Sequence, residues 1–109
     1  MRVIIDRIKD TYPPHLVMFI HGAPHRRQHR AIIRKYRELL RTAFHGVGLI
    51  TPYDGLVDLT LIFINPSSPD YDNLLTALYQ ALDGKTLGKG VLTDDENIWT
   101  IHGLKKLYT

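Results

Sequence analysis

The chain has 109 residues and a formal net charge of +3, and 44% of its residues are hydrophobic. This length and composition predict one folded domain over residues 1–109 and exclude bulk disorder. Because the chain has no cysteine and no apolar run near ~18 residues, it excludes disulfides, thiolate zinc sites and membrane-spanning helices. We therefore expect a soluble, cytoplasmic protein.

The first half of the chain predicts two strands followed by a helix. Residues 2–8 (RVIIDRI) and 15–22 (HLVMFIHG) are apolar or β-branched runs of strand length, and two prolines lie between them. From about residue 28 to residue 44 the apolar residues recur with a helical period. The residues expected on the buried face of this helix are Ile32, Ile33, Tyr36, Leu39, Leu40, Ala43 and Phe44.

The second half predicts a strand, a helix and a last strand. Residues 56–66 (LVDLTLIFINP) form a strand whose far half is nearly all apolar, which is typical of a central strand. A helix follows over about residues 71–82, and the last strand is expected to bury Ile98, Trp99 and Ile101. This order predicts an α/β (α+β) domain in which a mixed four-stranded sheet packs with two main helices.

Basic residues are concentrated in the first predicted helix and the loop before it. Residues 25–45 contain seven lysines or arginines and one acidic residue, whereas the rest of the chain is net acidic. Such a block favours a polyanionic partner, of which nucleic acid is the commonest. A solvated, arginine-rich helix face explains the charge run equally well.

Two aspartates, Asp70 and Asp72, lie where the second helix begins. A helix N-cap accounts for one of them, because its oxygen accepts an orphan backbone N–H. The second carboxylate lies close to the first and repels it, and a divalent cation would remove this repulsion. For the pair alone, capping is the simpler interpretation.

A second acidic group, Asp94, Asp95 and Glu96, comes just before the last strand. We expect the loop of about ten residues after the second helix to place the ends of the two elements side by side. Only one of Asp94 and Asp95 can face a shared site, because adjacent side chains in extended backbone point to opposite faces. Three aspartates make an all-oxygen site that suits Mg²⁺ or Mn²⁺, as expected of a metal-dependent phosphodiesterase.

Parts of the second half resemble the RusA family of Holliday-junction resolvases. The resemblance lies in residues 69–84 (PDYDNLLTALYQALDG), in residues 91–99 (VLTDDENIW) and in Lys105. It implies a RusA-like fold and a homodimeric crossover junction endodeoxyribonuclease that depends on Mg²⁺ or Mn²⁺. It also implies cleavage of four-way DNA junctions by paired nicks, in the recombination and repair of a bacterial or phage-bearing cell.

The resemblance assigns the catalytic carboxylates to Asp70, Asp72 and Asp95, with Asp94 as a further candidate metal ligand. The family's lysine, four residues after the second aspartate, is replaced by Thr76. A lysine there would stabilise charge on the phosphate, and Lys85, Lys89 or an arginine of the other subunit remain to supply it. The residues expected to bind DNA are Arg26, Arg27, Arg30, Arg34, Arg37, Arg41, Lys85, Lys89 and Lys105.

Two other functions remain open on the sequence. One is a non-catalytic nucleic-acid-binding module in which the aspartates are only helix caps, as the replacement at Thr76 favours. The other is an interaction protein whose arginine-rich helix binds an acidic partner. The two acidic groups together favour the junction endonuclease.

Overall fold

A computed structural model describes residues 1–25, 30–83 and 90–109. None of the described helices is both long and apolar enough to span a membrane. Over these residues the elements are β1 (Arg2–Lys9), β2 (His15–His21), α1 (Arg30–Gly46), β3 (Val57–Ile64), α2 (Tyr71–Leu82), the 3-10 turn η1 (Asp95–Asn97) and β4 (Ile98–Leu107).

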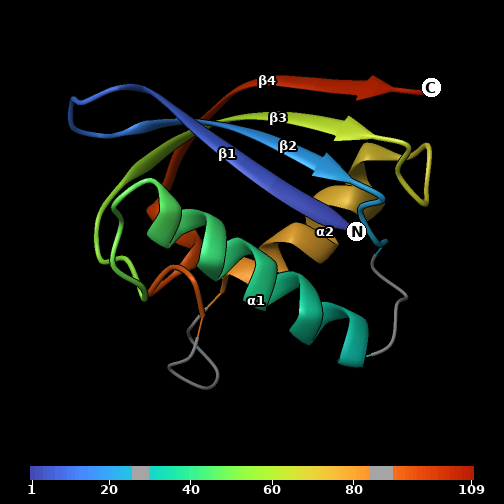
Figure 1. Ribbon diagram of the computed structural model, residues 1–109, viewed down its shortest axis with the longest axis horizontal. Helices are drawn as coiled ribbons and strands as arrows, with labels where there is room; N and C mark the ends of the chain where they lie inside the picture. Colours follow the sequence, from blue (N-terminus) through green and yellow to red (C-terminus); the bar gives the residue numbers. More distant parts are fainter. Residues whose placement is uncertain (26–29, 84–89) are drawn as a thin grey trace.

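The four strands form one sheet in the order β1-β2-β3-β4 (Figure 1). β1 pairs antiparallel with β2, whereas β2 with β3 and β3 with β4 pair parallel. Each parallel pair is joined through a helix, because parallel neighbours need a crossover connection. The predicted α/β domain with a mixed four-stranded sheet and two helices is confirmed, and β3 is a central strand as expected.

Both helices cover one face of the sheet (Figure 1). Alternate residues of β2 and β3 are buried on this face, because successive side chains of a strand point to opposite faces. The core between the two layers includes Leu16, Met18, Ile20, Leu59, Leu61, Phe63, Tyr36, Leu40, Phe44, Leu74, Leu78 and Leu82. The described part of the chain places no helix on the other face.

The buried face of α1 follows the predicted pattern except at its start. Tyr36, Leu40 and Phe44 are fully buried, and Ile33 packs against the core. Ile32, expected in the core, is 37% exposed. Each step of four residues rotates about 40° past a full turn, so Ile32 lies about 80° away from Leu40 around the helix axis.

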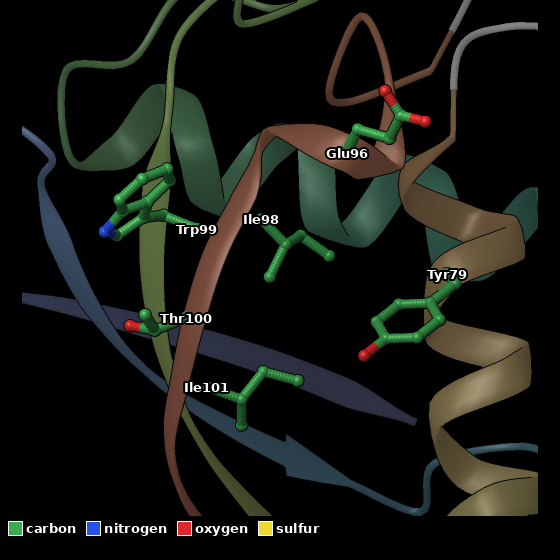
Figure 2. A pocket seen from close by; sticks show the side chains of 6 residues that line it. All are labelled: Tyr79, Glu96, Ile98, Trp99, Thr100 and Ile101. Carbon is green, nitrogen blue, oxygen red and sulfur yellow. The ribbon is translucent and has the colours of Figure 1, made fainter.

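Trp99 is another residue that the sequence prediction placed wrongly in the core. Its exposed fraction is 62%, while Ile98 and Ile101 pack against the core as predicted. Val57 pairs with Ile98 and the next residue of β3 pairs with Thr100, so Trp99 is the extra residue of a β-bulge. Trp99 and Ile98 therefore point to different sides of β4 (Figure 2).

The hydroxyl of Tyr36 is buried without a hydrogen-bond partner among the described residues. Burial also raises the pKa of this hydroxyl, so it stays neutral. Since an unsatisfied buried hydroxyl costs about 1–3 kcal/mol, we expect Tyr36→Phe to raise the free energy of unfolding by about 1–2 kcal/mol. Urea denaturation of both proteins measures this difference. A clear loss of stability in Tyr36→Phe would mean that the hydroxyl is hydrogen-bonded in solution.

Candidate functional site

The segment between β3 and α2 lies at the carboxyl ends of the parallel strands. The N–H of Gly22 donates to the carbonyl of Ile64 at 2.8 Å, and the N–H of Asn65 donates to the carbonyl of Leu107 at 2.8 Å. The chain leaving β2 and the end of β4 therefore flank the end of β3 (Figure 1). Ligands of open parallel sheets bind outside the carboxyl ends of the strands, so the fold favours a site at this edge.

Asp70 and Asp72 lie at this edge, and both are exposed. Asp70 is the N-cap of α2, because its Oδ1 accepts the backbone N–H of Asp72 at 2.9 Å. The Ser68 hydroxyl accepts the N–H of Asp70 at 3.2 Å and fixes the approach to the helix. Capping thus accounts for one oxygen of Asp70. Its second oxygen and the whole Asp72 carboxylate are not needed for the cap.

A lysine that the sequence analysis did not name, Lys106, lies beside this pair. The ammonium group of Lys106 donates to the carbonyl of Pro69 and lies 4.2 Å from the centre of the Tyr71 ring. Lys105 pairs with Ile62, whose side chain belongs to the uncovered face of the sheet. Sequence reasoning missed Lys106 because it selected Lys105 by its spacing from Asp94 in the resemblance, whereas Lys106 pairs with Phe63 and so lies on the covered face.

Thr76 lies one turn after Asp72 in α2, where the resemblance expects a lysine. Its hydroxyl donates to the carbonyl of Asp72 at 2.7 Å, a bond from one helical turn to the preceding one. Thr76 is therefore tied to the helix backbone and brings no charge to the site. The positive charge near residues 69–71 comes from Lys106, whose ammonium group contacts Pro69 and Tyr71.

The second acidic group begins where the chain returns to α2. The N–H groups of Val91 and Leu92 donate to the carbonyl of Leu82 at 3.1 and 2.9 Å, so this segment lies at the carboxyl end of α2. Two residues later, Asp94 Oδ1 accepts the N–H of Glu96 at 3.0 Å and caps the turn η1. Asp94 therefore has a structural role at the start of β4.

One chain does not bring the two acidic groups together. Asp70 precedes the first residue of α2 and Asp94 follows its last turn, and a helix of 12 residues is about 18 Å long. Val91 and Leu92 lie at the carboxyl end of α2, and not at its beginning, shortly before the start of β4. Among the described residues, no three His, Asp or Glu side chains form a group able to hold a metal ion. Asp95 opens η1, and its side chain lies outside the described part.

The arginines of α1 divide into two kinds. Arg37 donates from Nε to the carbonyl of Ala81 at 3.1 Å and from Nη2 to the carbonyl of Gln80 at 2.8 Å. It therefore satisfies the last carbonyls of α2 and joins the two helices. Arg41 forms an ion pair with Glu38 on the same helix.

The other predicted DNA-binding residues are only partly described. Arg30 and Arg34 are exposed at the amino-terminal half of α1, which leaves their charge available to a polyanion. Arg26, Arg27, Lys85 and Lys89 lie outside the described residues. A role in DNA binding stays a prediction for each of these residues.

A second polar group lies on the uncovered face of the sheet. The rings of His15 and His102 are 4.8 Å apart, and His15 Nε2 lies 2.8 Å from the hydroxyl of Thr60. The hydroxyl of Thr100 donates to Asp58 Oδ1 at 2.9 Å. These contacts join three neighbouring strands.

The candidate site is therefore the carboxyl edge of the sheet, where Asp70, Asp72 and Lys106 approach the start of α2. It combines two carboxylates with a nearby ammonium group and the positive end of a helix dipole. Such a site suits a cation held by the carboxylates and a phosphate held by the positive groups. Comparisons of the chain with protein-family models, curated proteins and solved structures find no match.

Proposed function

We propose that this protein is a metal-dependent, structure-selective DNA endonuclease that resolves four-way junctions by paired nicks. The observation that carries the proposal is the exposed pair Asp70 and Asp72 at the carboxyl edge of the sheet, with Lys106 beside it. The resemblance of residues 69–105 to the RusA family supports the same function. The exposed arginines of α1 supply the positive charge that a DNA-binding protein needs.

The donor atoms of this pair fit Mg²⁺ or Mn²⁺. Proteins usually hold Mg²⁺ with one or two carboxylates and leave its other positions to water and substrate phosphates. The second oxygen of Asp70 and the carboxylate of Asp72 provide such a set, and its all-oxygen chemistry does not suit zinc. When bound, the metal would activate a water and neutralise charge on the scissile phosphate.

The remaining steps follow from the chain's own residues. Asp70 is rigid because it caps α2, so it orients the carboxylate pair toward the substrate. Lys106 offers an ammonium group that stabilises negative charge on the phosphate or the leaving oxygen, a task that Thr76 cannot perform. Arg30 and Arg34 bind the phosphate backbone and carry no sequence preference.

The second candidate function is a non-catalytic module that binds nucleic acid. The bond from Asp70 to the N–H of Asp72 favours it, because an ordinary cap explains that contact completely. The bond of Thr76 to its own helix favours it too, since the family's lysine is absent.

Cleavage of a labelled synthetic four-way junction decides between the two functions. We expect the wild-type protein to nick opposing strands of the junction in Mg²⁺ or Mn²⁺, and to leave both the junction in EDTA and a matched linear duplex intact. Binding without cleavage in either metal would establish the non-catalytic module. Absence of binding even at low salt, where phosphate contacts are strongest, would favour an acidic protein partner.

Lys106→Met is expected to slow junction cleavage by about 10²-fold, because it removes a positive group next to the developing charge. Methionine nearly keeps the length of the side chain. The contacts described for the ammonium group are those with the Pro69 carbonyl and the Tyr71 ring. Lys105→Met makes the same change on the other face of the sheet and is expected to have a smaller effect. Single-turnover rates compare the two variants, and a larger effect at Lys105 would reverse the assignment.

A further inference from the structure

The Lys106 side chain reaches from the end of β4 to the start of α2. Its ammonium group donates to the carbonyl of Pro69 and lies 4.2 Å from the centre of the Tyr71 ring. Both contacts come from the segment that opens α2, whereas Lys106 itself belongs to β4. The side chain is therefore partly buried between the two elements and does not extend into solvent.

The strand end that carries Lys106 is fixed as well. The N–H of Asn65 donates to the carbonyl of Leu107 at 2.8 Å. The Asn65 side chain also binds Thr109, because its Oδ1 accepts the N–H of Thr109 at 3.0 Å and its Nδ2 donates to the Thr109 hydroxyl at 2.9 Å. Asn65 has a φ of 47°, a left-handed conformation that asparagine adopts more readily than most residues. These bonds tie the end of β4 to the end of β3, so the remaining freedom of Lys106 is that of its side chain.

The ammonium group of Lys106 does not use the neighbouring carboxylates as partners. The ion pairs of the described residues include none between Lys106 and Asp70 or Asp72. An ammonium group near two exposed carboxylates is attracted to them, and an ion pair would occupy the oxygens that a cation needs. The contacts with Tyr71 and Pro69 oppose this attraction, so they keep the ammonium group beside the pair without joining it to the pair.

The ring of Tyr71 makes this contact through its face. The face of an aromatic ring carries partial negative charge and attracts a cation that lies within about 6 Å of the ring centre. Tyr71 is partly buried and packs against the core, which gives the ring a fixed place. Phenylalanine at this position would keep the contact, whereas leucine would keep only the apolar packing.

We propose that Tyr71 is a positioning residue for Lys106: its ring holds the ammonium group beside the Asp70–Asp72 pair and out of an ion pair with it. This inference rests on the function proposed above, in which Lys106 stabilises negative charge on the phosphate. Because Tyr71 lies between the two aspartates in the sequence, the start of α2 presents both the carboxylates and the ring that positions the lysine.

Single-turnover cleavage of the four-way junction tests the positioning role. We expect Tyr71→Leu to slow cleavage by about 2–5-fold, the factor that corresponds to the loss of one cation–π contact at a partly exposed site. Tyr71→Phe is expected to restore most of this rate, because it keeps the ring. Tyr108→Leu is the matched control: it makes the same change two residues after Lys106, at a side chain that is 62% exposed, and we expect no effect on the rate.

The Lys106→Met background distinguishes positioning from a direct role of Tyr71 on DNA. Without the ammonium group, Tyr71→Leu is expected to cause no further loss, because two changes that remove the same interaction are not additive. The same 2–5-fold loss in both backgrounds would mean that the ring acts on the DNA itself, for example by stacking on a base, and would overturn the proposal.

An NMR measurement without DNA or metal tests the contact itself. Protons above the face of an aromatic ring resonate upfield, so we expect the ε-methylene protons of Lys106 upfield of the ordinary lysine position. Loss of this signal in Lys106→Met assigns it. The signal is expected to stay upfield in Tyr71→Phe and Tyr108→Leu, and to move to the ordinary position in Tyr71→Leu.

The outcomes separate this inference from the proposed function. An active protein without the upfield signal, or one whose Tyr71→Leu variant cuts at the wild-type rate, overturns only the inference about Tyr71. An upfield signal in a protein that never cuts the junction confirms the contact, but it contradicts both the proposed function and the positioning role.

Discussion

Asp72→Asn is expected to reduce the single-turnover rate of junction cleavage in Mg²⁺ by about 10³-fold or more. The carboxylate of Asp72 is exposed in the first turn of α2 and is not used by the helix cap, and in the proposed function it holds the cation. Asparagine has almost the same size, and we expect the free energy of unfolding to change by less than about 0.5 kcal/mol.

Junction binding separates this effect from misfolding. In EDTA the variant is expected to bind the junction as tightly as the wild type or more tightly, because a carboxylate next to a phosphate repels it. Asp83→Asn, at the other end of α2, removes the same charge from the same helix and is expected to cut at the wild-type rate. Equal losses in both variants would show that cleavage depends on general charge and not on the site at the start of α2.

Phe63→Ala is expected to lower the free energy of unfolding by about 3–5 kcal/mol. Phe63 is fully buried in β3 between the sheet and the helices, so the change leaves a cavity in addition to the lost apolar contact. Domains of this size have a total stability of about 5–15 kcal/mol. The expected loss is therefore a large share of the total.

Phe19→Ala is the matched comparison, because Phe19 lies in β2 on the face that no described helix covers. Its side chain is only partly buried, and we expect the loss to be at least about 2 kcal/mol smaller than for Phe63→Ala. Urea denaturation at one fixed protein concentration gives both values. Equal losses would contradict a sheet with one covered face.

The secondary structure follows from local patterns in the sequence. The apolar run in 57–64 and the helical period in 71–82 identify β3 and α2, because a central strand is apolar and a helix that buries one face has a regular apolar repeat. Strict alternation lets only one of Ile98 and Trp99 face the core. A bulge at Trp99, which depends on the pairing of β4 with β3, puts Ile98 and Ile101 on the same buried face and leaves Trp99 outside it.

The candidate site was only partly predictable. A helix cap was expected for one of Asp70 and Asp72, and the structure assigns the cap to Asp70. Arg37 was grouped with the DNA-binding arginines, although its contacts with Ala81 and Gln80 are tertiary and have no sequence pattern. Lys106 was missed because Lys105 was selected by its spacing in the resemblance, which carries no information about the faces of β4.

The two acidic groups lie far apart in one chain because of the direction in which α2 crosses between β3 and β4. A crossover helix between parallel strands runs antiparallel to them, so it begins at their carboxyl ends and finishes at their amino ends. Within one chain, Asp70 therefore lies at the carboxyl ends of the parallel strands and Asp94 at their amino ends. The sequence shows both groups but not the direction of α2 relative to β4.

The proposed function requires the carboxylate pair to use a divalent cation when a four-way junction is cut. In a metal-addition experiment, the wild-type protein is bound to a labelled junction in EDTA, and excess Mg²⁺ or Mn²⁺ is then added. We predict that the bound junction stays intact until the metal is added and then acquires symmetric nicks in two opposing strands. A complex that remains bound and uncut after both metals are added would contradict the proposed function.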